Sequence, residues 1–262
     1  MKKYLYFLAA TLILTGCKKD TKETPEETNP SDSDLAFTTT TYEKKTSLPC
    51  KENCANVSIV IPVADSPPVV ADSINKKVFN TIRQIVYFGE KPYNAANYED
   101  LMTSFIKSYE DLKKDFPEDD VIGWEGKVKG SVDYVSGKLI NIKLNHYTYT
   151  GGAHGYEGNR SLVFDHKTGR SLSYKDILKD EEGFKQYAEK KFREKFNIPA
   201  GKNINSTGLM FENEKFALPQ NIFFREDGLL LYYNSYEIAS YAEGQKELFL
   251  SYSEVAPFIN LK

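Results

Sequence analysis

Three histidines, His146, His154 and His166, are the only ones in the 262 residues, and a histidine is the usual catalytic base. Nucleophilic catalysis requires such a base beside an activated serine or cysteine. The sequence contains no Gly-x-Ser-x-Gly elbow, no His-Glu-x-x-His helix and no phosphate-binding loop. Carboxylate pairs leave an unrecognised hydrolase as an alternative, because their separation in space is invisible in a sequence. We expect a non-catalytic protein without a cofactor and without a metal.

The most distinctive stretch is the loop Thr150-Gly151-Gly152-Ala153-His154-Gly155. Its glycines allow a positive φ or the close approach of another chain. In a structural interpretation, His154 bonds a backbone carbonyl and locks a bend between two strands. In a functional interpretation, the loop and the strand before it contact a partner. The residues of this candidate binding site are Tyr147, Tyr149, Thr150, Gly151, Gly152 and His154.

The segment before this loop, residues 138–149, alternates like a strand with two different faces. One face carries Ile140, Ile142, Leu144 and His146, so we expect His146 to be a hydrogen-bonded residue at the edge of a core. The other face carries Asn141, Lys143, Asn145, Tyr147 and Tyr149 and is the better candidate for contact with a ligand. His166 flanks the tight reversal at residues 167–170.

The elements that position these residues follow from apolar spacing and turn signals. Segments rich in Thr, Val and Ile predict strands at 37–46 and 56–64. Helical spacing predicts a helix over 69–87 and a second one from the N-cap Asn97 to Pro117. The remaining expected elements are strands at 121–134, 160–166 and 246–252, helices at 173–178 and 182–196, a hairpin at 221–234 and a short C-terminal helix.

Strands in groups, with helices between the groups, indicate an α+β fold with antiparallel sheet packed by a few amphipathic helices. We expect two intimately associated halves, residues 35–157 with the glycine-rich loop and residues 158–262.

Cys50 and Cys54 form a Cys-x3-Cys pair. In an exported protein, oxidising surroundings favour a local disulfide between them. A redox-active or metal-binding pair is the alternative, but no second Cys/His pair lies nearby to complete a zinc site.

The N-terminus predicts export. A basic start and an apolar run over residues 4–14 are typical of a signal peptide, because the run is too short to span a bilayer. The run ends in Leu-Thr-Gly-Cys, which resembles the bacterial lipobox and makes Cys17 the acylated anchor of a lipoprotein. An ordinary secretory signal is the alternative. Residues 1–17 are thus the expected lipoprotein signal, with the lipid anchor in a membrane.

Residues 18–34 are charged, rich in Pro and Thr, and poor in apolar side chains, so we expect a disordered tether. Their lysine and acidic residues resemble the export signals of surface lipoproteins. We expect an outer-membrane or cell-surface location, with the periplasmic side as the alternative. A net charge of −3 with interleaved signs gives no basic surface for nucleic acid, so we expect no nucleic-acid partner.

Three motifs together resemble a two-part extracytoplasmic module of unknown function. They are the Tyr-Thr-Gly-Gly-Ala-His-Gly loop, the Asp-x-x-Thr-Gly-x-x-Leu turn at 165–172 and the Tyr-Glu-Ile-Ala-x-Tyr loop at 236–241. The module is similar to the outer domain of the lysozyme-sensing anti-sigma factor RsiV. Its first half also resembles the non-catalytic N-terminal part of the peptidoglycan deacetylase PdaC. The resemblance spans residues 42–252.

The resemblance implies an α+β domain that faces the cell envelope and binds lysozyme or a related muramidase. By this analogy, Tyr236 and Tyr241 border the same surface as His154. We expect a lipobox in place of the transmembrane and cytoplasmic segments of an anti-sigma factor, and we expect no catalytic deacetylase domain. The alternative partner is an envelope glycan, such as peptidoglycan or another oligosaccharide, with Trp124 and the tyrosines stacked on sugar rings.

Overall fold

The computed structural model describes residues 35–50, 52–116 and 122–260 of the chain. The expected signal peptide, the anchor Cys17 and the tether of residues 18–34 lie outside the described residues, as does Pro117. Among the helices of the described ranges, none has the length and apolar character that crossing a bilayer requires.

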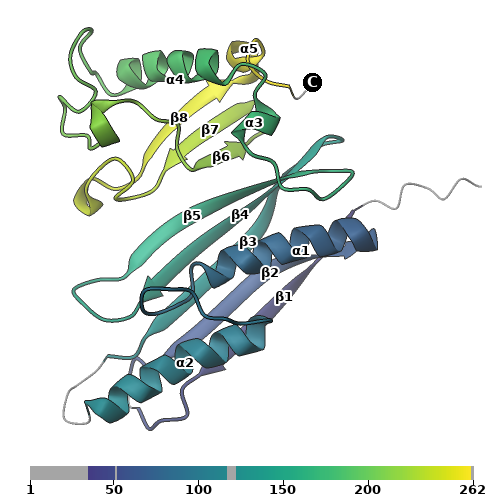
Figure 1. Cartoon of the computed structure of the whole chain (residues 1–262), viewed down its shortest axis with the longest axis vertical. Helices are drawn as coiled ribbons and strands as arrows, with labels where there is room; N and C mark the ends of the chain where they lie inside the picture. Colours follow the sequence, from purple (N-terminus) through teal and green to yellow (C-terminus); the bar gives the residue numbers. More distant parts are fainter. Residues whose placement is uncertain (1–34, 51, 117–121, 261–262) are drawn as a thin grey trace, which may run out of the picture. The chain divides into compact units, whose positions relative to one another are not determined.

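The chain forms a five-stranded sheet and then a three-stranded sheet, each with helices (Figure 1). The first sheet contains β1 (Ala36–Lys45), β2 (Asn56–Ser66), β3 (Glu125–Val135), β4 (Leu139–Tyr149) and β5 (Tyr156–Asp165), with α1 (Pro68–Arg83) and α2 (Tyr98–Asp115) between β2 and β3. The later elements are α3 (Tyr174–Ile177), α4 (Glu181–Lys195), η1 (Glu212–Glu214), β6 (Asn221–Phe224), β7 (Gly228–Tyr233), η2 (Tyr241–Glu243), β8 (Lys246–Ser251) and α5 (Tyr252–Val255). The expected α+β class is confirmed.

The first sheet is mixed and not purely antiparallel as we expected. Its strand order is β1-β2-β3-β4-β5, and β2 and β3 run parallel, with Asn56 opposite Glu125. Parallel neighbours require a long crossover connection. The segment with α1 and α2 supplies it, since it returns the chain to the starting end of the sheet before β3 begins.

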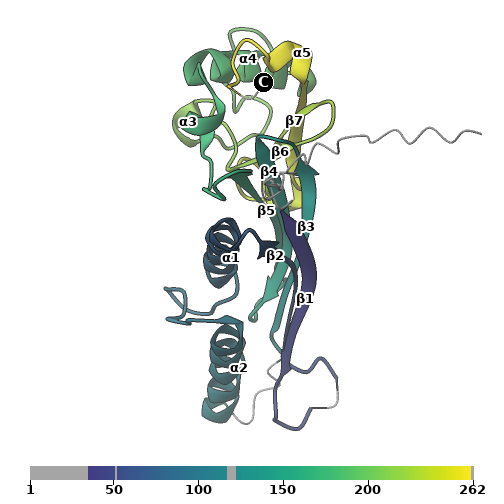
Figure 2. The ribbon, with the colours of Figure 1, turned by 90° about the vertical axis from the view of Figure 1, so that its right-hand side faces the viewer.

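Both helices cover the same face of the first sheet (Figure 2). Asn97 is the expected N-cap of α2, because its side-chain oxygen accepts a hydrogen bond from the backbone N–H of Asp100 at 2.8 Å. The apolar stripes of the two helices pack against the sheet and bury, among others, Ile74 and Phe105 completely. The opposite face of this sheet, which we call the open face, is not covered by α1 or α2 (Figure 2).

Trp124 belongs to the core under the helices, which corrects its predicted role as a sugar-stacking residue. Its side chain has 0% exposure. The indole ring packs against Phe88 at 4.3 Å, Phe105 at 5.7 Å and Tyr109 at 5.9 Å between ring centroids. A ligand cannot reach this ring without unfolding the core around it.

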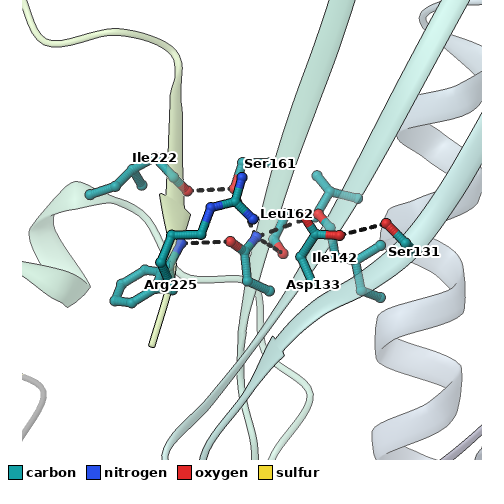
Figure 3. A network of polar contacts seen from close by, with 9 residues as sticks. Ser131, Asp133, Ile142, Ser161, Leu162, Ile222 and Arg225 are labelled. Carbon is teal, nitrogen blue, oxygen red and sulfur yellow. Dashed lines mark hydrogen bonds and ion pairs between the residues drawn. The ribbon is translucent and has the colours of Figure 1, made fainter. Parts of the chain in front are cut away.

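The two halves share a core. Leu139 and Val163 belong to the first sheet but pack into the second apolar cluster, with the residues of β6, β7 and α4. The strand β5 crosses the boundary that we expected between residues 157 and 158 and completes the first sheet. An ion pair between Asp133 and Arg225, at 3.1 Å, also joins the halves (Figure 3).

Asn141 contributes a polar joint to this shared core. Its side-chain oxygen accepts a hydrogen bond from Phe224 N at 2.9 Å, and its Nδ2 donates to Ser161 Oγ at 2.8 Å. Ser161 Oγ donates in turn to the carbonyl of Ile222 at 2.5 Å (Figure 3). Buried polar groups of this kind are stable only when they are hydrogen-bonded, so the joint fixes how β6 lies against β4 and β5.

Asparagine side chains also cover the outer edge of β5. The amide of Asn234 bonds both backbone groups of Asn159, accepting from N at 2.7 Å and donating to O at 3.0 Å. Asn221 Oδ1 accepts from Ser161 N at 2.9 Å. An uncovered strand edge would present these groups to other chains. The second half thus protects the first sheet and is attached to it at the same place.

Candidate functional site

The glycine-rich loop is held by its own hydrogen bonds. His154 Nδ1 donates to the carbonyl of Gly155 at 2.8 Å, and the Tyr149 hydroxyl donates to the carbonyl of Gly152 at 3.1 Å. Gly151 and Gly152 have φ values of 108° and 88°, in the region that favours glycine. The bend is therefore locked by His154, as the structural interpretation predicted.

Gly155 is required for a different reason, the close approach of Tyr147. A Cβ atom added to Gly155 would lie 2.4 Å from the tip of the Tyr147 ring. The ring therefore lies directly against the backbone of the loop. This contact sets the position of Tyr147 on the open face.

His154 also stacks on Tyr241, which comes from the second half of the chain. The two ring centroids are 4.3 Å apart and the planes differ by 16°. Tyr236 in turn stacks on Tyr241, with ring centroids 5.6 Å apart and planes that differ by 29°. Tyr236 and Tyr241 are 55% and 39% exposed. We call His154, Tyr236 and Tyr241 the aromatic cluster. It brings together the two loops that the sequence predicted to border one surface.

The loop that carries Tyr236 and Tyr241 is fixed by Glu237. Its carboxylate accepts hydrogen bonds from the backbone N–H groups of Gln220 and Asn234, at 2.8 and 2.9 Å. Burial raises the pKa of Glu237, and the two backbone bonds oppose this shift. The Tyr-Glu-Ile-Ala motif thus builds a rigid loop, and its tyrosine is the part that remains accessible.

A hollow of about 800 Å³ lies on the open face beside the cluster, and we call it the aromatic hollow. Four of the predicted residues line it, namely Tyr147, Tyr149, His154 and Tyr241. Tyr236 lies next to it through its contact with Tyr241, whereas Thr150, Gly151 and Gly152 belong to the loop but not to the lining. The structure therefore brings residues of both halves to one concave surface.

Sequence reasoning missed the polar residues of the aromatic hollow. They come from neighbouring strands and a loop and are Lys45, Asn53, Asn56, Glu125 and Lys127. Strand register places them there, since Glu125 lies opposite Tyr149 and Lys127 opposite Tyr147. Glu125 and Lys127 form an ion pair with each other. The pairing of β1 with β2, of β2 with β3 and of β3 with β4 brings these residues together, and a sequence does not display such pairing.

The disulfide between Cys50 and Cys54 is present, as predicted, and Cys54 reaches the wall of the aromatic hollow. The backbone of Gly123 passes so close that a Cβ there would lie 1.8 Å from the carbonyl oxygen of Asn53. The disulfide loop therefore packs on the chain just before β3 and forms one side of the site.

The other two histidines lie outside the hollow. His146 is buried, with 3% exposure, but neither ring nitrogen has a hydrogen-bond partner among the described residues, so the predicted hydrogen bond is wrong. Burial, with a contribution from the charge of Arg160, lowers the pKa of His146 to about 4. His166 flanks its turn, where the Asp165 carboxylate accepts hydrogen bonds from the backbone N–H groups of Lys167 and Thr168. Within the described ranges, no three His, Cys, Asp or Glu residues are grouped so that they could hold a metal ion.

Fold and site define a class, a two-part α+β protein whose halves jointly form an aromatic surface. The family comparisons assign both parts. Residues 48–157 match the family model described as deacetylase PdaC, and residues 175–253 match the protein family of unknown function DUF3298. Residues 48–157 thus form a PdaC-like domain, and a DUF3298 domain follows at residues 175–253. No curated protein matches the sequence.

Solved structures of DUF3298 proteins share the fold. A member from Bacteroides fragilis has a TM-score of 0.67 and 20% identity, over 86% of this chain and 94% of that one. A member from Pseudomonas aeruginosa has a TM-score of 0.64 and 19% identity, over 88% of this chain and 96% of that one. At these identities the likeness concerns the architecture alone.

Proposed function

We propose that this chain is a non-catalytic binding domain of a cell-envelope lipoprotein, and that its aromatic cluster binds a protein of the lysozyme type. The observation that carries the proposal is the stack of His154, Tyr241 and Tyr236, contributed by both domains and exposed to solvent. Large aromatic side chains at a surface supply contact area at a low cost in side-chain entropy. They are enriched among the residues that dominate binding energy in protein interfaces.

The chemistry of the aromatic hollow favours binding over catalysis. Glycoside hydrolysis usually needs two carboxylates, and Glu125 is the one acidic residue among the described residues that line this hollow. Lys127 already pairs with it. The sulfur of Cys54 is committed to the disulfide and cannot act as a nucleophile. His154 uses Nδ1 to hold its own loop, which is a structural role.

The choice of lysozyme rests on the resemblance to the outer domain of a lysozyme-sensing anti-sigma factor. A tethered domain of this kind inhibits a muramidase by occupying its cleft, and it needs only affinity and abundance. The rigid loops around Tyr236 and Gly152 fit this role, because a preorganised surface loses little entropy on binding.

A calorimetric titration of the full chain with c-type lysozyme tests the proposal. We expect a dissociation constant below about 1 μM, or about −8 kcal/mol. His154→Ala and Tyr236→Ala should each weaken binding about tenfold or more, with unchanged circular dichroism. Lys190→Ala, on the exposed surface of α4, is the matched control and should bind like the wild type. If the folded wild type does not bind, lysozyme is removed as the partner.

The lipoprotein part of the proposal has its own test. Cys17 is the expected acylation site, and cells fed with labelled palmitate should transfer label to the wild-type chain. The variant Cys17→Ser should lose the label and the membrane association together. A labelled Cys17→Ser chain would contradict the lipobox assignment.

A further inference from the structure

A second hollow lies on the open face, adjacent to the aromatic hollow. Its volume is about 410 Å³, and Tyr241 lines both hollows. Its wall is rich in side-chain amides, so we call it the amide hollow. The residues that matter for its chemistry are Lys143, Asn145, Glu157, Asn159, Tyr232 and Gln245.

The wall of the amide hollow is ordered by its own hydrogen bonds. Asn159, with 8% exposure, donates from Nδ2 to the Tyr232 hydroxyl at 2.8 Å. Asn145 Nδ2 donates to Glu157 Oε1 at 3.2 Å and to Asn159 Oδ1 at 3.4 Å. These bonds come from β4, β5 and β7, so polar groups of three strands are held in fixed positions before any ligand arrives.

Several of these groups keep unused hydrogen-bonding capacity. The Tyr232 hydroxyl accepts from Asn159 and retains its own proton to donate. Asn145 Oδ1 and the side chain of Gln245 have no hydrogen-bond partner among the residues that the structure describes. The ammonium of Lys143 lies 5.8 Å from the centre of the Phe223 ring and has no carboxylate partner in the same described ranges. Donors and acceptors therefore both face the hollow.

The balance of charge and polarity selects the kind of ligand. Lys143 and Glu157 carry opposite charges, so the hollow offers no net attraction to a polyanion or a polycation. Its volume lies in the range of small-molecule sites, about 300–1,000 Å³. A pyranose ring matches such a wall, because each hydroxyl both donates and accepts and one ring face is apolar.

We propose that the amide hollow binds a neutral saccharide, whose hydroxyls bond Asn145, Glu157 and Tyr232 while an apolar ring face lies near Tyr241. This site shares Tyr241 with the aromatic cluster but is otherwise formed by other residues, and it does not depend on lysozyme as a partner. Since Tyr241 lines both hollows, a longer chain of sugars extends from the amide hollow toward His154.

Titration of the full chain with two neutral tetrasaccharides, chitotetraose and cellotetraose, tests this site. We expect binding of at least one of them with a millimolar or lower dissociation constant. Asn145→Ala and Glu157→Gln should each weaken it about fivefold or more through lost hydrogen bonds. Among the described residues, neither side chain hydrogen-bonds to the three-stranded sheet, so the melting temperature should fall by no more than about 4 °C. Lys190→Ala is again the control and should bind normally.

The arms of the experiment separate this site from the proposed protein site. Tyr236→Ala should weaken lysozyme binding but leave saccharide binding intact, because Tyr236 does not line the amide hollow. Free glutamine serves as a small zwitterionic probe. The proposal is overturned if the folded chain binds neither tetrasaccharide, if binding is unchanged in both amide-hollow variants, or if glutamine alone binds.

Discussion

The two faces of the first sheet differ sharply although the same strands form them. On β4, the alternate residues Ile140, Ile142 and Leu144 are fully buried beneath the helices. Their neighbours Lys143 and Asn145 point to the open face and remain partly exposed. Because side chains alternate along a strand, one face can be given to stability and the other to binding. The position of a residue along β4 therefore predicts whether its substitution changes stability or binding.

The open face is itself divided. Near β6, the second domain covers Leu139 and Asn141 and makes them part of the shared core. Beyond that joint, the face stays accessible and carries the aromatic and amide hollows. The DUF3298 domain thus contributes to the site in two ways, by covering one end of the face and by supplying Tyr241 at the other.

The largest difference between the faces should appear on removing an aromatic ring from each. Trp124→Ala should lower the free energy of unfolding by about 3–5 kcal/mol, because the ring is fully buried among Phe88, Phe105 and Tyr109. Tyr149→Ala, on the open face, should cost about 1 kcal/mol or less. Urea unfolding measures both values. Equal losses of unfolding free energy would contradict the claim that the covered face, and not the open face, carries the stability.

Acid should act on the covered face through His146. Its pKa is about 4 in the folded chain, below the usual value near 6.5, so the unfolded chain binds the extra proton first. The contribution of neutral His146 to the free energy of unfolding is fully present above about pH 6.5. It is lost as the pH falls toward 4, by at most about 3 kcal/mol. His146→Leu should remove this part of the slope when unfolding is measured between these pH values. An unchanged slope in that variant would assign the acid sensitivity to other groups.

Replacing an asparagine at the joint and one on the open face should change the free energy of unfolding by amounts that differ less than those of the aromatic pair. Asn234→Ala leaves the N–H and carbonyl of Asn159 without their partners and should cost about 2–3 kcal/mol. Asn145→Ala is the matched change on the open face and should cost under about 1 kcal/mol. Thermal unfolding of the pair measures the difference. Comparable losses would show that the joint does not depend on Asn234.

The smallest effect on stability, with a clear effect on binding, is expected at Gly155. A methyl group there would meet the tip of the Tyr147 ring, which can swing aside into solvent. Gly155→Ala should therefore change stability by about 1 kcal/mol or less and weaken lysozyme binding several-fold. The control Gly137→Ala has open space around its Cβ and should change neither property. If Gly155→Ala binds lysozyme normally, the position of the Tyr147 ring does not matter for binding.

Local patterns in the sequence predicted much of this structure. Alternation along residues 138–149 separated the two faces of the strand, and the N-cap at Asn97 and the disulfide of Cys50 and Cys54 are as expected. Asn141 is the exception, since it was predicted on the accessible face but is buried under the second half of the chain. Both loops that resemble family motifs come together at His154 and Tyr241. These features depend on neighbours in the chain or on motifs of fixed spacing, which a sequence displays directly.

Features that depend on distant pairing were missed. The parallel pairing of β2 and β3 follows from a crossover of two helices, and it places Glu125 and Lys127 in the site. A tryptophan such as Trp124 can stack on a ligand or pack in a core, and only its burial in the structure shows that it belongs to the core. The asparagine joint was invisible for the same reason, since Asn159 and Asn234 are 75 residues apart in sequence.

Hydrogen exchange of the full chain, with and without c-type lysozyme, tests whether the open face is the binding surface. Lysozyme should slow the exchange of backbone amides in the loops at 147–155 and 236–243 and leave exchange in α1 and α2 unchanged. Protection of the helices with unprotected loops, or no protection anywhere at saturating lysozyme, would contradict the claim that the open face is the binding surface.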